Sequence, residues 1–206
     1  MFLIDTILPV ALAFFIVTIS PGPANLAVAT IAMRQGRRAG QVFGLGLSLG
    51  LAFWGIVAAS GMGAILQASA NALFLMKLLG GLYLLWLAVQ SVRSTLRTTQ
   101  VQDTQIKSGR WFWQGLLLNM SNPKAVVAWM AALSVGLNAE GGLLQIIVLT
   151  GICIAIGFAN YAGYAMAFSL PGIMSGYQRI NRWVEGTVAV LFAAAGLGLL
   201  RSAFSR

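Results

Sequence analysis

The sequence predicts an all-α integral membrane protein with six transmembrane helices. The first observation is composition: of 206 residues, 59% are hydrophobic and only 8% are charged, against about 25% charged residues in an ordinary soluble domain. The second is that long apolar runs separate the charges, and a helix needs about 20 apolar residues to cross a bilayer. Open strands cannot cross, because their backbone groups would lack hydrogen-bond partners. The third observation is that these runs repeat.

The charge-free runs recur in the same order in the two halves of the chain. In the first half they hold 28, 38 and 15 residues, at positions 6–33, 39–76 and 78–92. In the second half they hold 29, 38 and 15 residues, at positions 111–139, 141–178 and 186–200, with Lys124 as the one interruption. We therefore predict two three-helix repeats, 1–92 and 111–206, joined by a cytoplasmic polar loop at 93–110. Because three is an odd number, the second repeat enters the membrane from the opposite side, so the repeats are inverted in topology.

The first predicted span, residues 4–33, is broken near its centre by two prolines and a glycine. Proline lacks a backbone donor and clashes with the preceding turn, and glycine adds backbone freedom. The run 6–33 would be about 42 Å long as a straight helix, more than a roughly 30 Å hydrocarbon core requires. A break at mid-membrane frees amides that suit a carboxylate and carbonyls that suit an ammonium group. The candidate binding residues here are Ser20, Pro21, Gly22, Pro23 and Asn25.

The second and third predicted spans are residues 40–62 and 71–92. Glycines spaced by four, at 36, 40 and 44 and again at 46 and 50, place small residues on helix faces and predict close packing rather than binding. A turn is expected at Gly61-Met62-Gly63. Lys77 lies about two turns into the third span, where snorkelling to the interface and substrate binding are both open readings.

The fourth predicted span, residues 111–137, carries the second break. Its midpoint is Lys124, and a cation at mid-bilayer costs at least about 2.5 kcal/mol. Either a substrate anion or structural pairing with exposed helix carbonyls would explain it. A lone proline would indicate a plain kink, but paired breaks at corresponding places in two repeats favour a transport site. The candidate binding residues here are Asn119, Asn122, Pro123 and Lys124.

The fifth and sixth predicted spans are residues 143–168 and 182–202, separated by a turn at Pro171-Gly172. Asn160 is the only amide side chain in the second part of span five, and we add it to the candidate binding residues. Glu185 lies one turn into span six, near Arg182. No carboxylate is expected at mid-membrane, so Lys124 and Glu185 are the only candidates for a group that couples transport to protons.

Loop charges predict the orientation. The chain has 13 Lys and Arg, 4 Asp and Glu, no His and a net charge of +9. Because the bases are few and lie between apolar blocks, they indicate anchoring at the membrane edge rather than nucleic-acid binding. The loops after spans one, three and five carry nine bases: Arg34, Arg37, Arg38, Arg93, Arg97, Lys107, Arg110, Arg179 and Arg182. The positive-inside rule puts these loops in the cytoplasm and both termini outside.

Two motif blocks give the chain a resemblance to a known family. The stretch Ser20-Pro21-Gly22-Pro23-Ala24-Asn25 and the stretch Asn119-Met120-Ser121-Asn122-Pro123-Lys124 resemble the LysE/RhtB family of amino-acid exporters. The stretch that follows Lys77, the central polar loop and the length agree as well. The resemblance implies export of an amino acid or a close derivative from the cytoplasm by antiport with protons, across a bacterial-type inner membrane. It also implies functional roles for the two breaks and for Lys77.

The resemblance leaves substrate class and mechanism as expectations. Where family members carry an aspartate in span five, this chain has only Asn160. A small zwitterionic amino acid is therefore expected rather than a basic one, with Lys124 on its carboxylate and two rocking halves around the site. No cofactor or metal is expected, because histidine is absent and no ligand cluster is present.

Three other classes compete with an exporter. A non-transporting scaffold of the same fold is the main alternative. A membrane enzyme is disfavoured, since acid–base residues are scarce, and an ion channel is disfavoured by a central lysine without acidic rings. The expected partners are the bilayer, the amino acid and protons, without nucleic acid, and the small-residue faces permit a homodimer without indicating one.

Overall fold

The computed structural model describes residues 6–68, 70–95, 109–122, 124–126, 128–129, 132 and 143–204. Throughout these residues the chain forms helices and turns without a strand, which confirms the all-α prediction. The helices are α1 (Leu8–Ile19), α2 (Pro23–Gln35), α3 (Arg37–Ala68), α4 (Ala70–Thr95), α5 (Trp111–Met120), α7 (Leu143–Ala167) and α8 (Ile173–Phe204).

The first predicted span is two helices bent by 57° at residues 20–22. Ser20 ends α1 in an extended conformation, Gly22 precedes α2 with a fully extended backbone, and Pro23 occupies the first turn of α2. Proline is favoured there because the first helical amide has no intrahelical partner. The break predicted at the two prolines is therefore confirmed.

The second break is confirmed for the residues that the structure describes. Helix α5 ends at Met120, Ser121 caps it, and helical structure resumes at Lys124. The amide of Ala125 donates to the carbonyl of Asn122 at 3.0 Å, which closes the first turn after the break. Pro123, the residue that the sequence predicts as the cause of this break, lies outside the described residues.

The turn predicted at Gly61-Met62-Gly63 is wrong, because α3 continues through these residues to Ala68. Glycine is tolerated within membrane helices, so two glycines are a weaker stop signal than the two prolines of the first break. The turn at Pro171-Gly172 is confirmed, and Gly172 there has a φ of +82° that favours glycine. Helix α8 begins at Ile173, earlier than the predicted span.

Several helices are long and apolar enough to cross a membrane. Within the described residues these are Arg37–Gly61, Leu143–Ala167 and Arg182–Phe204, and the bent α1–α2 pair makes a fourth if it counts as one span. Helix α4 holds a shorter apolar stretch, Leu78–Arg93. The arrangement of six spans in two inverted repeats stays a prediction.

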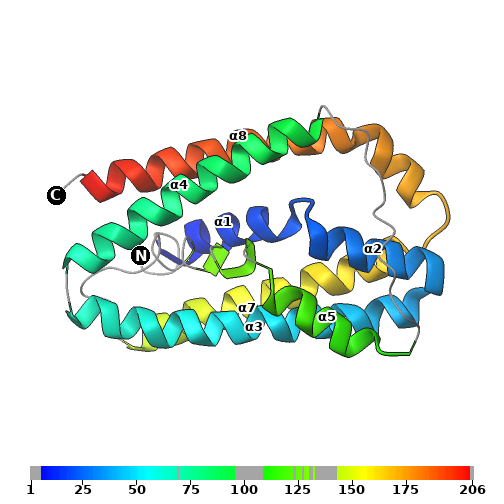
Figure 1. Ribbon diagram of the computed structural model, residues 1–206, viewed down its shortest axis with the longest axis horizontal. Helices are drawn as coiled ribbons and strands as arrows, with labels where there is room; N and C mark the ends of the chain where they lie inside the picture. The colour runs from blue at the N-terminus through cyan, green and yellow to red at the C-terminus, as the bar shows by residue number, and fades with distance from the viewer. Residues whose placement is uncertain are drawn as a thin grey trace.

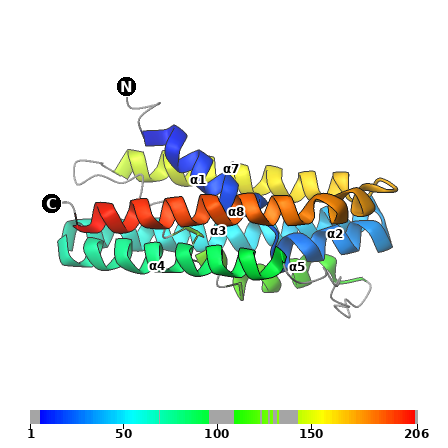
Figure 2. The ribbon, with the colours of Figure 1, turned by 90° about the horizontal axis from the view of Figure 1, so that it is seen from above.

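The described helices pack as two units (Figures 1 and 2). Helices α4 and α8 run side by side along most of their length, and we call them the α4–α8 pair. Helix α3 packs against α5 and α7, while α1 and α2 also pack on α7; we call these five helices the broken-helix unit. The third helix of each predicted repeat thus pairs with its counterpart in the other repeat.

Glycines set the closest helix contacts within each unit. A Cβ at Gly46 of α3 would lie 2.1 Å from the carbonyl oxygen of Phe112, and one at Gly115 of α5 would lie 2.2 Å from that of Phe43. In the α4–α8 pair, a Cβ at Gly81 would lie 2.7 Å from Leu200. The packing role predicted for Gly40, Gly44, Gly46 and Gly50 is confirmed, and close backbone approach is the physical reason. For Gly36 the prediction is wrong, because Gly36 ends α2 with a φ of +86° and a Cβ there would meet nothing within 4 Å.

Gly163 of α7 makes no such close contact. A Cβ at Gly163 would meet nothing within 4 Å. Gly163 lines an open groove between α1 and α7 instead, beside Asn160 and Tyr164.

Several described arginines of the predicted cytoplasmic loops lie at helix ends, whereas Arg179 and Arg182, expected in a loop, lie within α8. Arg34 is in the last turn of α2, Arg93 is in the last turn of α4, and Arg110 caps the start of α5. These helix ends and the start of α8 lie toward the right of Figure 1. The start of α1 and the end of α8 lie toward the left.

Candidate functional site

The two breaks meet at Lys124. Its ammonium group donates to the carbonyl oxygen of Ser20 at 3.1 Å, to the Ser20 hydroxyl, and to the carbonyl oxygen of Pro21 at 3.5 Å. These acceptors are the C-terminal end of α1, where the helix leaves carbonyls free and carries a partial negative charge. A Cβ at Gly22 would lie 3.1 Å from the Lys124 Nζ, so glycine leaves room for the ammonium group. The sequence placed both breaks at mid-membrane, and the structure joins them.

Asn25 holds the first break in its bent form. Its side-chain amide donates to the carbonyl of Thr18 at 2.6 Å and to that of Ser20 at 2.9 Å. Its Oδ1 accepts a bond from the Asn160 amide at 3.2 Å. Asn25 and Asn160 are both buried. Because a buried polar group must be hydrogen-bonded, these bonds fix the angle between α1 and α2.

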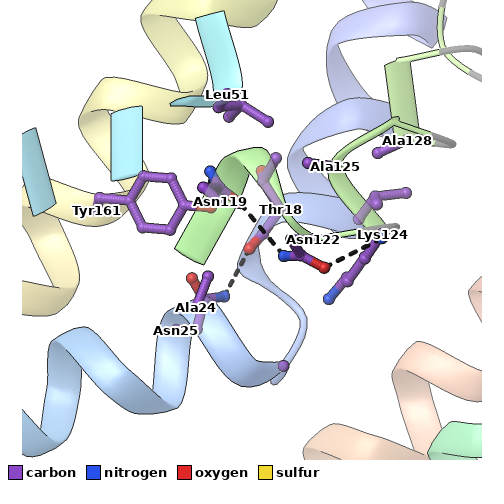
Figure 3. Close-up of a pocket in the computed structure, with 12 residues that line it drawn as sticks. Thr18, Ala24, Asn25, Leu51, Asn119, Asn122, Lys124, Ala125, Ala128 and Tyr161 are labelled. Atoms are coloured by element: carbon purple, nitrogen blue, oxygen red, sulfur yellow. Dashed lines mark hydrogen bonds between the residues drawn. The ribbon is translucent and has the colours of Figure 1, made fainter. Parts of the chain in front are cut away.

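Asn119 performs the same task at the second break. Its amide donates to the carbonyl of Leu47 at 2.7 Å and to the Tyr161 hydroxyl at 3.1 Å, while its Oδ1 accepts from the Asn122 amide at 3.2 Å. The backbone amide of Lys124 in turn donates to Asn122 Oδ1 at 3.1 Å. Figure 3 shows these side chains. The space that they surround has a volume of about 20 Å³, which admits a water molecule at most.

A larger cavity of about 410 Å³ opens on the other side of Lys124, between the breaks and the α4–α8 pair. Its described lining combines the break residues, polar groups of α4, aromatic rings and two charges of opposite sign. The lining residues are Pro21, Gly22, Pro23, Leu26, Tyr83, Trp86, Leu87, Gln90, Ser91, Asn122, Lys124, Glu185 and Phe192. A volume of this size suits a small organic molecule.

Glu185 corrects the expectation that no carboxylate reaches the site. The sequence placed it near the cytoplasmic boundary beside Arg182, but it is only 4% exposed and lines the same cavity as Lys124. The two charges interact electrostatically. Sequence position alone could not show this, because α8 reaches the breaks only through its packing with α4 and α1.

Most sequence-predicted site residues come together in the fold. Pro21, Gly22, Pro23, Asn122, Lys124 and Glu185 line the cavity. Ser20 and Asn119 bond to lining residues. Asn25 bonds to Ser20, and Asn160 bonds to Asn25, so these two belong to the hydrogen-bond network behind the lining. Pro123 and the side chain of Lys77 lie outside what the structure describes.

Sequence reasoning missed three kinds of residue at the site. Tyr161 supports Asn119, the Tyr83 ring lines the cavity, and Gln90 and Ser91 add polar groups from α4. Trp86 of α4 also lines the cavity and is 48% exposed. Polar residues in an otherwise apolar third span were the available signal for Gln90 and Ser91.

Asn119 offers a test of the second break. We expect Asn119→Leu to lower the free energy of unfolding by about 2 kcal/mol, because the substitution removes its hydrogen bonds and strands buried partners. Thermal unfolding of the purified protein in detergent measures this. Ser60→Ala, which removes an exposed hydroxyl, should change stability by less than about 0.5 kcal/mol. Equal stability of both variants would contradict the role given to Asn119.

The fold and the site together indicate the class of protein. A half-buried lysine at the meeting point of two helix breaks, inside a bundle of apolar helices, is the architecture of a membrane transporter. Comparison with known families is specific: the chain matches the LysE type translocator family over residues 15–203. The chain belongs to this family, and the resemblance stated from the two motif blocks is confirmed.

The chain is also similar to individual membrane proteins, two of which are named for amino-acid efflux. The chain is 32% identical to the threonine efflux protein of Escherichia coli (strain K12), over 95% of this chain and 97% of that protein. It is 27% identical to the homoserine/homoserine lactone efflux protein of Salmonella typhi, over 83% and 80% of the two chains. It is also 31% identical to the uncharacterized membrane protein YahN of Escherichia coli (strain K12), over 91% and 85%. No solved structure matches the chain.

Proposed function

We propose that this protein is a secondary transporter that exports a small zwitterionic amino acid, or a close derivative, from the cytoplasm. The observation that carries the proposal is the Lys124 ammonium group, held at the first break and facing a cavity of about 410 Å³. The family consists of translocators and includes relatives named for threonine and homoserine efflux. We propose no catalytic activity for the chain.

The carboxylate of the substrate would bind at the positive corner of this cavity. Lys124 supplies a full charge, and the start of α2, at Gly22 and Pro23 on the cavity wall, supplies the partial positive charge of a helix N-terminus. The carbonyls at the end of α1 hold the ammonium group of Lys124 in place. Of the residues predicted from sequence, Asn25, Asn119 and Asn160 then support the breaks rather than contact the substrate.

The membrane arrangement follows from the same proposal. We propose six spans in two inverted repeats, with 1–92 and 111–206 around the polar loop 93–110, in a bacterial inner membrane. The helix ends that carry Arg34, Arg93 and Arg110 lie toward one end of the molecule, whereas Arg201 lies in the last turn of α8 at the other end. The positive-inside rule would place the end with more arginines in the cytoplasm. The termini would then lie outside.

Alternating access would arise between the two packed units. The α4–α8 pair shares few contacts with the broken-helix unit, and the cavity lies between them. We propose that the pair rocks as one body, in place of the rocking of whole repeats that the sequence alone suggests. Entry of a proton as the amino acid leaves would drive the cycle, with Lys124 and Glu185 as the candidate coupling groups.

Export of the whole free amino-acid pool tests the function. Cells that express this chain, and matched cells with an empty vector, would be compared by mass spectrometry of medium and cytoplasm. We expect faster release of one or two small neutral amino acids from the expressing cells, with the other amino acids unchanged. If no amino acid is released faster at a verified membrane abundance, the exporter is wrong and the non-transporting scaffold takes its place.

A further inference from the structure

The substrate cavity carries one charge of each sign, on different units. Lys124 belongs to the broken-helix side and Glu185 to α8. Every other described residue that lines the cavity is uncharged. Glu185 is 4% exposed, so its carboxylate lies away from bulk water, where a charge is stable only with charged or polar partners.

The α4–α8 pair also presents a polar atom without a partner. Tyr83 lines the cavity, and its hydroxyl is buried and makes no hydrogen bond among the described residues. A buried hydroxyl without a partner is costly and rare in a native structure. This hydroxyl is therefore available to a polar group of a ligand that binds in the cavity.

We propose that Glu185 binds the ammonium group of the exported amino acid, with the Tyr83 hydroxyl as a further acceptor, while Lys124 binds its carboxylate. This inference rests on the proposed function and adds the residue that recognises the amino end. The ammonium group has three donors and suits a carboxylate and a hydroxyl oxygen together.

The charge balance of the cavity supports this pose. Without substrate, Lys124 and Glu185 interact with one another, and their charges sum to zero. A zwitterion inserted between them gives each protein charge a partner of opposite sign and leaves the sum at zero. A substrate with a third charge would bury that charge without a partner, which is strongly unfavourable, so the pose selects uncharged side chains.

The pose also links binding to movement. The carboxylate end would contact the broken-helix unit and the ammonium end would contact the α4–α8 pair. A ligand shifts a conformational equilibrium only through its differential affinity for the two states. A zwitterion that bridges the two units favours the state in which these units lie close together. A molecule with only one of the two charges would contact one unit alone.

Efflux of paired substrates from proteoliposomes tests the role of Glu185. The vesicles would contain the purified full chain and be loaded with an equimolar mixture of neutral L-amino acids and their 2-hydroxy acid counterparts, in which a hydroxyl replaces the ammonium group. We expect the wild-type protein to release its amino acid roughly 30-fold or more faster than the matching hydroxy acid, because one end of a buried charge pair is missing.

The variants separate recognition from structure. In Glu185→Gln the preference for the amino acid should collapse toward equal rates, in Glu185→Asp it should be largely retained, and in Tyr83→Phe it should fall by several-fold. Trp183→Phe alters a side chain on the same helix that is 80% exposed and should leave the preference unchanged. A structural role for Glu185 would slow both compounds equally and keep their ratio.

The experiment distinguishes failure of the role of Glu185 from failure of the proposed export function. An unchanged ratio in Glu185→Gln, whether total efflux falls or not, overturns the inference and leaves the exporter intact. If the wild-type protein releases no amino acid at all, the proposed function fails and the inference fails with it.

Discussion

Replacing Lys124 with alanine should reduce amino-acid export to the level of cells without the protein, a fall of roughly 100-fold or more. The substitution removes the positive charge from the cavity, leaves Glu185 as the only charge among its described lining residues, and takes the donor from the carbonyls of Ser20 and Pro21. Truncation of one partner of a hydrogen-bonded charge pair, here Lys124 and the substrate carboxylate, costs about 2–5 kcal/mol in binding, which is the source of the expected factor. Export would be measured by mass spectrometry of the medium.

The matched control for this prediction is Arg110→Ala. It removes the same charge from an exposed position before α5, away from the cavity, and should leave the export rate unchanged. Both variants must reach the membrane in equal amounts. Wild-type export from Lys124→Ala cells would keep the transporter but remove Lys124 from its mechanism.

Replacing Gly46 with alanine should destabilise the protein by about 3 kcal/mol. The new Cβ would lie 2.1 Å from the carbonyl oxygen of Phe112 and 2.8 Å from the amide nitrogen of Leu116. Both are backbone atoms, so α3 and α5 must separate, and overpacking of this kind typically costs about 1–3 kcal/mol, occasionally more. Thermal unfolding in detergent measures the change.

Gly151→Ala is the matched control within α7. A Cβ there would meet nothing within 4 Å, and alanine favours a helix over glycine by roughly 0.5–1 kcal/mol. This variant should therefore be as stable as the wild type or slightly more stable. If both alanine variants shift stability in the same direction, the close approach of α3 and α5 is not what glycine provides at position 46.

Local chemistry explains why the first break could be predicted from sequence. Pro21 and Pro23 disrupt a helix wherever they stand, so the bend needed no knowledge of distant residues. The packing role of Gly46 could also be predicted locally, because small residues spaced by four indicate a close helix contact. The pattern does not show which helix makes that contact. The partner, α5, is visible only in the folded chain.

The composition of the site depends on tertiary packing and was only partly predictable. Side-chain type identified Lys124 and the asparagines, since polar groups are expensive within a membrane. Position along α8 did not show that Glu185 shares a cavity with Lys124, because neither its burial nor the pairing of α4 with α8 is encoded in a local pattern. The wrong turn prediction at Gly61 has a different cause. The local pattern of glycines indicated a turn, but the chain continues there as helix α3.

Protection of a cavity residue by substrate tests most directly whether the amino acid binds between the breaks and the α4–α8 pair. Ser91→Cys places a thiol on the cavity wall, and Ala159→Cys places one in the uncharged groove of about 380 Å³ between α1 and α7. Cys153, the single native cysteine, is 0% exposed and gives little background. N-ethylmaleimide would label the purified variants with and without the exported amino acid.

We expect the amino acid to slow labelling of Ser91→Cys several-fold and to leave labelling of Ala159→Cys unchanged. Protection of Ala159→Cys alone would place the substrate in the α1–α7 groove, and a labelling rate of Ser91→Cys that does not respond to saturating amino acid would contradict the site.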